Sequence, residues 1–254
     1  MTTGPFHSDV VRLDASGPVA TITLDSPHNR NALSRALVED LTRALTAAVA
    51  GNAKAVFLTH TGNTFCAGAD LREATTEGMS AGTRRVLELL RTVVALPTPV
   101  VAVVRGHVRA GGIGLVGACD LALATDASSF AFSEVRLGLT PAIISLTTID
   151  KLAPRTAARL FLTGVTFDGA EAARAGLVST AVPEADLDDT VQQLSAELVR
   201  ASPQGLRETK QLLNEPVLTR IDRDGERLMA LSSRLFASPE AQQRMSAALT
   251  RSRT

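Results

Sequence analysis

The chain has 254 residues, and its 26 lysines and arginines balance its 26 aspartates and glutamates. That length is enough to bury a substantial core in one large domain or two small ones, and the balanced charge provides no long-range field to attract nucleic acid or an acidic membrane surface. Aromatic residues make up 3%, with no Trp or Tyr, which argues against a surface for stacking single-stranded bases. We therefore expect neither a nucleic-acid nor a membrane partner.

The two cysteines, Cys66 and Cys119, lie far apart and match neither a zinc motif nor a disulfide framework. The histidines lack partners at ligand spacing, so the sequence predicts no metal site. The first residues do not resemble a signal peptide, and no apolar run approaches the roughly 20 residues that span a bilayer. These features predict a cytoplasmic protein.

The first third of the chain alternates strand and helix patterns. Residues 19–24 are rich in β-branched side chains and predict a strand, which the polar loop 25–31 ends. Ser34 is a candidate N-cap for a helix whose apolar residues recur every four positions. We expect this helix to end at Gly51 and Asn52.

The same alternation continues toward the middle of the chain. Residues 55–59 predict a strand, and residues 84–96 predict a helix closed by two prolines. A second apolar strand, 100–104, leads through a glycine-dense turn, 110–117, to a strand at 120–124. Repeated strand and helix favour an α/β architecture.

The last part of the chain is mostly helical. Pro154 suits the first turn of a helix, and Asp168 with Glu171 resembles a capping box for a short helix that ends at Gly176. After a brief strand at 177–182 the pattern is helical from Asp186, with expected breaks near residues 202–203 and 215–216. This predicts an α/β core over residues 1–195 and a helical region over 196–254.

The glycine-dense segment matches G-x-G-x-x-G at Gly112, Gly114 and Gly117. A dinucleotide site needs the first glycine at the strand end, and residues 105–111 intervene here, so a dinucleotide-binding oxidoreductase is a remote alternative. Close helix–sheet packing explains these three glycines but leaves Gly111 and the small-residue loop 66–69 unexplained. Two segments with accessible backbone N–H groups predict a site for a developing oxyanion, such as a thioester carbonyl becoming an enolate.

Five segments together resemble the crotonase, or enoyl-CoA hydratase/isomerase, superfamily, and the likeness covers almost the whole chain. They are residues 31–33 (NAL), 65–71 (FCAGADL), 106–112 (GHVRAGG), 118–120 (ACD) and 133–141 (SEVRLGLTP). The resemblance implies a spiral of ββα units, a helical C-terminal region that forms trimer contacts, and a homotrimer or a hexamer of two trimers. It also implies an acyl-CoA thioester substrate and no cofactor beyond the coenzyme A of that substrate.

The resemblance also implies roles for particular residues. The backbone N–H groups of Ala69 and Gly111 match the oxyanion hole, and Glu134 matches the second of two catalytic glutamates. The first glutamate of the family falls at Gly114. The positions expected at the substrate or coenzyme A are Arg30, Ala32, Cys66, Gly68, Asp70, Leu71 and Gly114, with Arg72 as a further phosphate contact.

One missing carboxylate leaves three functions open. Residues 133–145 and 114–120 resemble a bacterial branch that includes methylglutaconyl-CoA-type hydratases, so we expect an enoyl-CoA hydratase. The alternatives are a Δ3,Δ2-enoyl-CoA isomerase that uses Glu134 alone, and a weakly catalytic acyl-CoA-binding homologue.

Overall fold

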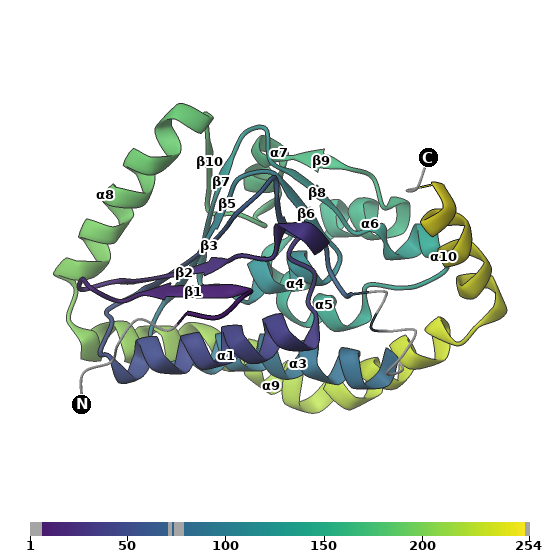
Figure 1. Cartoon of the computed structure of the whole chain (residues 1–254), viewed down its shortest axis with the longest axis horizontal. Helices are drawn as coiled ribbons and strands as arrows, with labels where there is room; N and C mark the ends of the chain where they lie inside the picture. Colours follow the sequence, from purple (N-terminus) through teal and green to yellow (C-terminus); the bar gives the residue numbers. More distant parts are fainter. Residues whose placement is uncertain (1–6, 71–72, 74–78, 252–254) are drawn as a thin grey trace.

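A computed structural model of the chain describes residues 7–70, 73 and 79–251. Two sheets organise it (Figure 1). The main sheet has the order β1 (Val11–Asp14), β2 (Ala20–Leu24), β3 (Val56–His60), β5 (Val100–Val104), β7 (Leu121–Thr125) and β10 (Thr180–Val182). The smaller sheet has the order β4 (Thr64–Cys66), β6 (His107–Arg109), β8 (Ser129–Ala131) and β9 (Phe167–Asp168). Only the edge strands β1 and β9 pair antiparallel among these.

The chain is a spiral of ββα units. Each unit adds one strand to the main sheet and one to the smaller sheet, and then forms a helix. The units are β3–β4 with α3 (Met79–Ala95), β5–β6 with α4 (Gly111–Ala118), and β7–β8 with α5 (Ala142–Thr148). Neighbouring parallel strands start at the same end of a sheet, so a long connection must carry the chain back between them. The helix of each unit lies in that connection. This confirms the expected α/β spiral.

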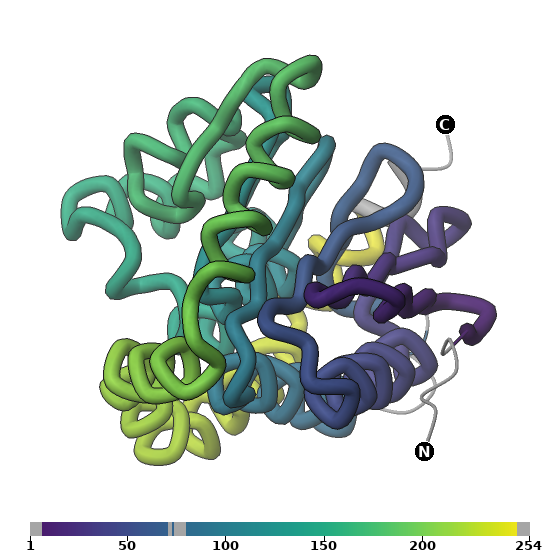
Figure 2. The backbone as a smooth tube through the Cα atoms, turned by 90° about the vertical axis from the view of Figure 1, so that its left-hand side faces the viewer, coloured from purple at the N-terminus to yellow at the C-terminus, as the bar shows by residue number. Residues whose placement is uncertain are grey.

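The main sheet is buried on both faces. The alternate residues Val100, Ala102 and Val104 of β5 belong to the principal core, together with α1 (Arg35–Ala50) and α3. Val101 and Val103 face a second apolar cluster that α8 (Leu187–Arg200) covers. Figure 2 shows α8 running alongside the strands. Burial on both sides explains why this strand is apolar at every position.

Several predicted boundaries are confirmed. The Ser34 hydroxyl accepts a hydrogen bond from the Leu37 N–H at the start of α1, and Gly51 ends that helix. Asp168 accepts from the Glu171 N–H at 2.7 Å at the start of α7 (Gly169–Ala175). Pro154 begins α6 (Pro154–Thr163). The short 3₁₀ segments are η1 (Pro27–Asn29), η2 (Ser133–Leu137), η3 (Ile149–Lys151) and η4 (Glu184–Asp186).

The prediction of a turn over residues 110–117 is wrong, because most of this segment forms α4. The helix tolerates its glycines because it is buried between other elements that supply its stability. The predicted strand at 177–182 is present only as Thr180–Val182, and the predicted helix 84–96 extends back to residue 79.

The C-terminal region consists of α8, α9 (Pro203–Phe236) and α10 (Pro239–Arg251), and α9 runs beneath α3 and α5 (Figure 1). The expected break at 202–203 is confirmed by the N-cap Ser202. The expected break at 215–216 is wrong, because Pro216 lies inside α9. An interior proline costs about 3 kcal/mol, and side chains that anchor α9 on both sides, Asn214 and Ile221, offset that cost.

The predicted boundary at residue 195 falls inside α8, and the division into two regions stays a prediction. Among the described residues, none of the helices combines the length and apolar character that crossing a bilayer requires.

Candidate active site

Glu134 lies in η2, directly after the smaller sheet's strand β8. A left-handed residue, Gly138 (φ 73°), ends this turn, and the Leu139 N–H donates to the Glu134 carbonyl at 3.0 Å. The carboxyl oxygen Oε2 is buried and has no hydrogen-bond partner within the described part of the chain. Burial penalises the charged form and raises the pKa of Glu134 from 4.5 to about 7.

The loop 66–69 lies against the N-terminus of α4. Gly68 has a φ of +93°, and a Cβ atom there would lie 2.9 Å from the Ala110 Cβ and 3.2 Å from the Gly111 nitrogen. Only glycine permits both this conformation and this approach. Ala110, just before the helix, itself has a φ of 46°, which is strained for a residue with a side chain. The two segments are therefore in backbone contact.

The backbone N–H groups of Ala69 and Gly111 are available to a ligand. Neither donates a hydrogen bond within residues 7–70, 73 and 79–251. A Cβ atom on Gly111 would lie 3.7 Å from the Ala69 nitrogen, so the two groups are neighbours. Both residues line the same cavity as Glu134. Two adjacent free donors beside a buried carboxyl can stabilise an oxyanion while a proton moves at the next carbon.

The buried side chain of Asn31 links residue 26 to the segment that precedes the loop 66–69. Its Oδ1 accepts from the Ser26 N–H at 2.7 Å, and its Nδ2 donates to the Thr61 and Thr64 carbonyls at 3.1 and 2.8 Å. The Leu33 N–H then donates to the Gly68 carbonyl at 2.8 Å. Leu33 thus holds the loop 66–69 beside residues 31–33.

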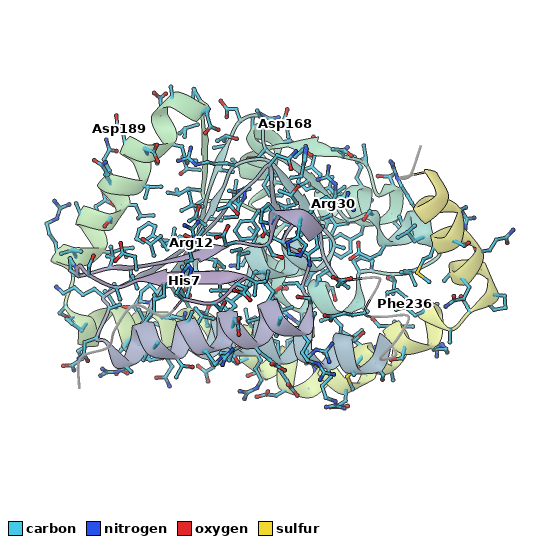
Figure 3. The ribbon with its side chains drawn as sticks, in the orientation of Figure 1. His7, Arg12, Arg30, Asp168, Asp189 and Phe236 are labelled. Carbon is cyan, nitrogen blue, oxygen red and sulfur yellow. The ribbon has the colours of Figure 1, made fainter. Side chains whose placement is uncertain are left out.

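The rest of the cavity wall is largely apolar. Its larger apolar side chains are Leu33, Val86, Leu137, Leu139, Ile143, Ile144 and Phe236. The charged residues Glu73 and Arg85 also line it. Thr83, Thr140, Ser133 and Ser232 add hydroxyl groups. Figure 3 labels Phe236 at the end of α9, next to α10. Sequence reasoning missed Val86 and Phe236, because helix periodicity identifies a buried face without saying which side chains border a cavity.

The predicted site residues separate into two groups. Ala69, Asp70, Gly111 and Glu134 line the cavity. Within the described chain, Arg30, Ala32, Cys66, Gly68 and Gly114 are not among its lining residues. Arg30 is exposed at the end of η1 (Figure 3), and Ala32 is buried. Leu71 and Arg72 lie outside the described residues, and contacts of all these residues with coenzyme A stay predictions.

The other polar candidates have structural partners. Cys66 is buried, its sulfur accepts from the Gly68 N–H at 3.4 Å, and burial raises its thiol pKa to about 12, which disfavours a nucleophilic thiolate. Asp70 accepts from the Asn29 side chain at 3.3 Å and from the Glu73 N–H at 3.4 Å. Among the described residues, no His, Cys, Asp and Glu side chains gather as three or more potential metal ligands.

Gly114 is covered by α5. A Cβ atom on Gly114 would lie 2.6 Å from Cγ2 and 2.9 Å from Cβ of Ile144. The Thr147 hydroxyl also donates to the Gly114 carbonyl at 2.9 Å. This packing leaves no room for any side chain at residue 114, so a glutamate there would require α5 to move.

The comparisons with known proteins agree with this geometry. Residues 14–251 match the family model described as enoyl-CoA hydratase/isomerase. The chain belongs to this family. Among solved structures, an enoyl-CoA hydratase from Mycobacterium avium is 47% identical, with a TM-score of 0.90, over 96% of this chain and 98% of that one. An enoyl-CoA hydratase from Mycobacterium smegmatis is 27% identical, with a TM-score of 0.77, over 96% and 97%.

A further relative is the hydroxycinnamoyl-CoA hydratase-lyase of Pseudomonas fluorescens. It is 31% identical over 221 residues, which cover 83% of this chain and 80% of the relative. Membership of this family implies an acyl-CoA thioester substrate.

The buried carboxyl of Glu134 makes the stability of this family member depend on pH. Its pKa of about 7 lies above the 4.5 of an exposed glutamate, so the folded state binds the proton more tightly. The free energy of unfolding should therefore fall by about 3 kcal/mol as the pH rises from about 4.5 to above 7. Glu134→Gln lacks this loss. The free energy of unfolding of the variant minus that of wild type, measured by urea unfolding, should therefore be larger at pH 8 than at pH 5. An equal difference at both pH values would contradict a pKa of about 7 for Glu134.

Proposed function

We propose that this protein is an enoyl-CoA hydratase that adds water across the double bond of a 2-enoyl-CoA thioester. The observation that carries the proposal is the buried carboxyl of Glu134, whose pKa is about 7 and whose Oε2 has no partner within the described residues. It shares one cavity with the N–H groups of Ala69 and Gly111, which donate no hydrogen bond within those residues. A group whose pKa lies near the working pH both accepts and donates a proton efficiently. The names of the Mycobacterium avium and Pseudomonas fluorescens relatives support the same reaction.

In the proposed mechanism one carboxylate performs both proton transfers. The thioester carbonyl accepts hydrogen bonds from the Ala69 and Gly111 N–H groups. Ionised Glu134 takes a proton from water as the water oxygen bonds to C3, and the electrons of the double bond move onto the carbonyl oxygen as an enolate. Protonated Glu134 then gives this proton to C2, which restores the carbonyl and the carboxylate. Each donor to such an oxyanion contributes about 10²- to 10³-fold in rate.

A second candidate is a Δ3,Δ2-enoyl-CoA isomerase, and the contact of Gly114 with Ile144 favours it, since that contact excludes a second carboxylate at this position. Ionised Glu134 would take a proton from C2 of a 3-enoyl thioester. The same oxyanion hole would hold the dienolate, and Glu134 would return the proton at C4. This reaction needs a single base and no water.

The two candidates differ in what happens to two test substrates. Purified protein is incubated in D₂O with crotonyl-CoA or with 3-hexenoyl-CoA, and the products are identified by mass and by their position of deuteration. We expect crotonyl-CoA to gain one D₂O and yield 3-hydroxybutyryl-CoA. Conversion of 3-hexenoyl-CoA to the 2-enoyl ester without addition of water to either substrate would replace the hydratase by the isomerase.

Turnover of neither substrate, together with tight binding of both, would instead identify the weakly catalytic acyl-CoA-binding homologue that the sequence also allows.

For assembly, we propose a homotrimer or a hexamer of two trimers, since Leu212 and Leu213 of α9 expose 71% and 68% of their surface. A cytoplasmic location and the absence of a cofactor beyond coenzyme A belong to the same proposal.

A further inference from the structure

Ile144 of α5 both lines the cavity and packs against α4. Its side chain is 4% exposed and lines the cavity that holds Glu134. It also rests on the bare backbone of Gly114, with its Cγ2 at 2.6 Å from the position that a Cβ atom would take. One turn further along α4, Gly117 is covered by α5 in the same way, through Thr147 and Thr148. Backbone-to-side-chain packing of two helices at two successive turns gives Ile144 little freedom to move.

The position of Ile144 relative to the reacting atoms follows from helix geometry. Gly111 and Gly114 are three residues apart in α4, so they lie on the same side of the helix, separated by about 4.5 Å along its axis. A thioester carbonyl bound at the Gly111 N–H has C3 two bonds beyond its carbonyl carbon, within about 2.5 Å. With the acyl chain directed along α4 from Gly111 toward Gly114, the side chain that covers Gly114 adjoins C2 and C3, and Ile144 lines the same cavity as Gly111.

The remaining walls restrict where substituents of C3 can point. The acyl chain beyond C3 is apolar and requires the apolar lining that Val86, Leu139 and Phe236 supply. Glu134 needs its own approach to C2 and C3 to transfer a proton. A second substituent on C3 then meets the wall that Ile144 forms over Gly114.

We propose that Ile144 is a specificity-determining residue, which excludes thioesters with a methyl branch at C3 and admits those with a straight chain. This distinguishes the protein from the methylglutaconyl-CoA-type hydratases that residues 114–120 and 133–145 resemble, because their substrate carries a methyl branch. This inference rests on the proposed acyl-CoA function and names its substrate class. A methyl group in a well-packed apolar pocket changes discrimination by about 10- to 200-fold. Shortening Ile144 to alanine should therefore raise the relative affinity for the branched thioester by about 10-fold or more.

The test measures binding, so that it does not depend on turnover. In protein carrying Glu134→Gln, isothermal titration calorimetry gives the Kd of crotonyl-CoA and of its branched analogue 3-methylcrotonyl-CoA. We expect Ile144→Ala to shift the ratio of the two Kd values by about 10-fold or more toward the branched ester. The control is Leu146→Ala, which shortens another buried residue of α5 that is 1% exposed and is not among the residues lining the cavity within the described chain. Its ratio should stay within about threefold of the parent, well under the effect of one methyl group.

Each outcome decides one question. Binding of both thioesters with an unchanged ratio in Ile144→Ala, or an equal shift in Leu146→Ala, overturns the role of Ile144 and leaves the proposed function standing. Failure of the Glu134→Gln parent to bind any thioester removes the proposed function and this inference with it. If Ile144→Ala does not fold, Ile144→Val tests the same direction with a smaller expected shift, and an unchanged ratio there overturns the proposal.

A measurement without ligand tests the contact itself. Gly114→Ala should lower Tm in the wild-type background, because its Cβ atom would press on Ile144. In the Ile144→Ala background the same substitution should lower Tm less, because the contact with Cγ2 at 2.6 Å is gone while the contact with Cβ at 2.9 Å remains. Equal losses in both backgrounds would show that the Cγ2 atom of Ile144 does not close the space above Gly114.

Discussion

Replacing Glu134 by glutamine is expected to lower kcat/KM for the proposed hydration by about 10²- to 10⁴-fold. Glutamine keeps the size of the side chain but neither accepts nor releases the proton that moves between water and C2. The free N–H groups of Ala69 and Gly111 remain, so thioester binding should persist in the variant. The expected result is a loss in kcat with Kd for the thioester nearly unchanged.

The pH profile of the wild type provides an independent check on this role. Glu134 must be ionised to accept a proton from water, and its pKa is about 7. The value of kcat/KM should therefore rise with pH up to about pH 7 and then level off.

The matched control for Glu134→Gln is Glu226→Gln, because Glu226 is an exposed residue of α9 that pairs with Arg84. A Glu134→Gln variant within tenfold of this control would rule out Glu134 as the acid–base group.

The second large effect concerns Lys210, whose ammonium group is buried between α9 and the sheet. Its Nζ donates to the Val93 and Thr98 carbonyls at 3.0 Å each and lies 2.8 Å from Oδ2 of Asp120. Lys210→Met keeps the apolar stem and removes the charge, which leaves a nearly buried carboxylate without its cation. We expect the free energy of unfolding to fall by about 3–5 kcal/mol.

Urea unfolding followed by circular dichroism at one protein concentration measures this loss. The matched control is Lys54→Met. Lys54 also donates to two backbone carbonyls, those of Val199 and Ala201, but these bonds involve no carboxylate. The free energy of unfolding should fall clearly less in Lys54→Met than in Lys210→Met. Equal losses in the two variants would show that the ion pair with Asp120 adds nothing to stability.

Lys210 lies on α9, the helix that also contributes residues to the wall of the cavity that holds Glu134. Asn214, one turn later on α9, donates to the second oxygen of Asp120 at 2.8 Å and to the Val94 carbonyl at 3.1 Å. These bonds hold α9 beside the sheet, and the far end of the same helix places Ser232 and Phe236 in the cavity wall. The same helix therefore carries both this buried network and part of the cavity wall.

The sequence by itself determined the features that depend on neighbouring residues. The caps at Ser34 and Asp168 were predictable because each involves a side chain and an N–H group three residues later. The strand Val100–Val104 was predictable because burial on both faces requires an apolar residue at every position. The clustering of Glu134 with the loops around Gly68 and Gly111 was inferred from residue types and from a family resemblance.

Only the tertiary structure decided the features that depend on contacts between distant segments. Pro216 remains inside α9 because packing on both sides of it outweighs its local cost. The segment after Ala110 is a helix because buried surroundings stabilise glycines that disfavour helix on their own. The pKa of Glu134 and the closed space above Gly114 likewise depend on burial and on α5, and no local pattern of residues encodes either.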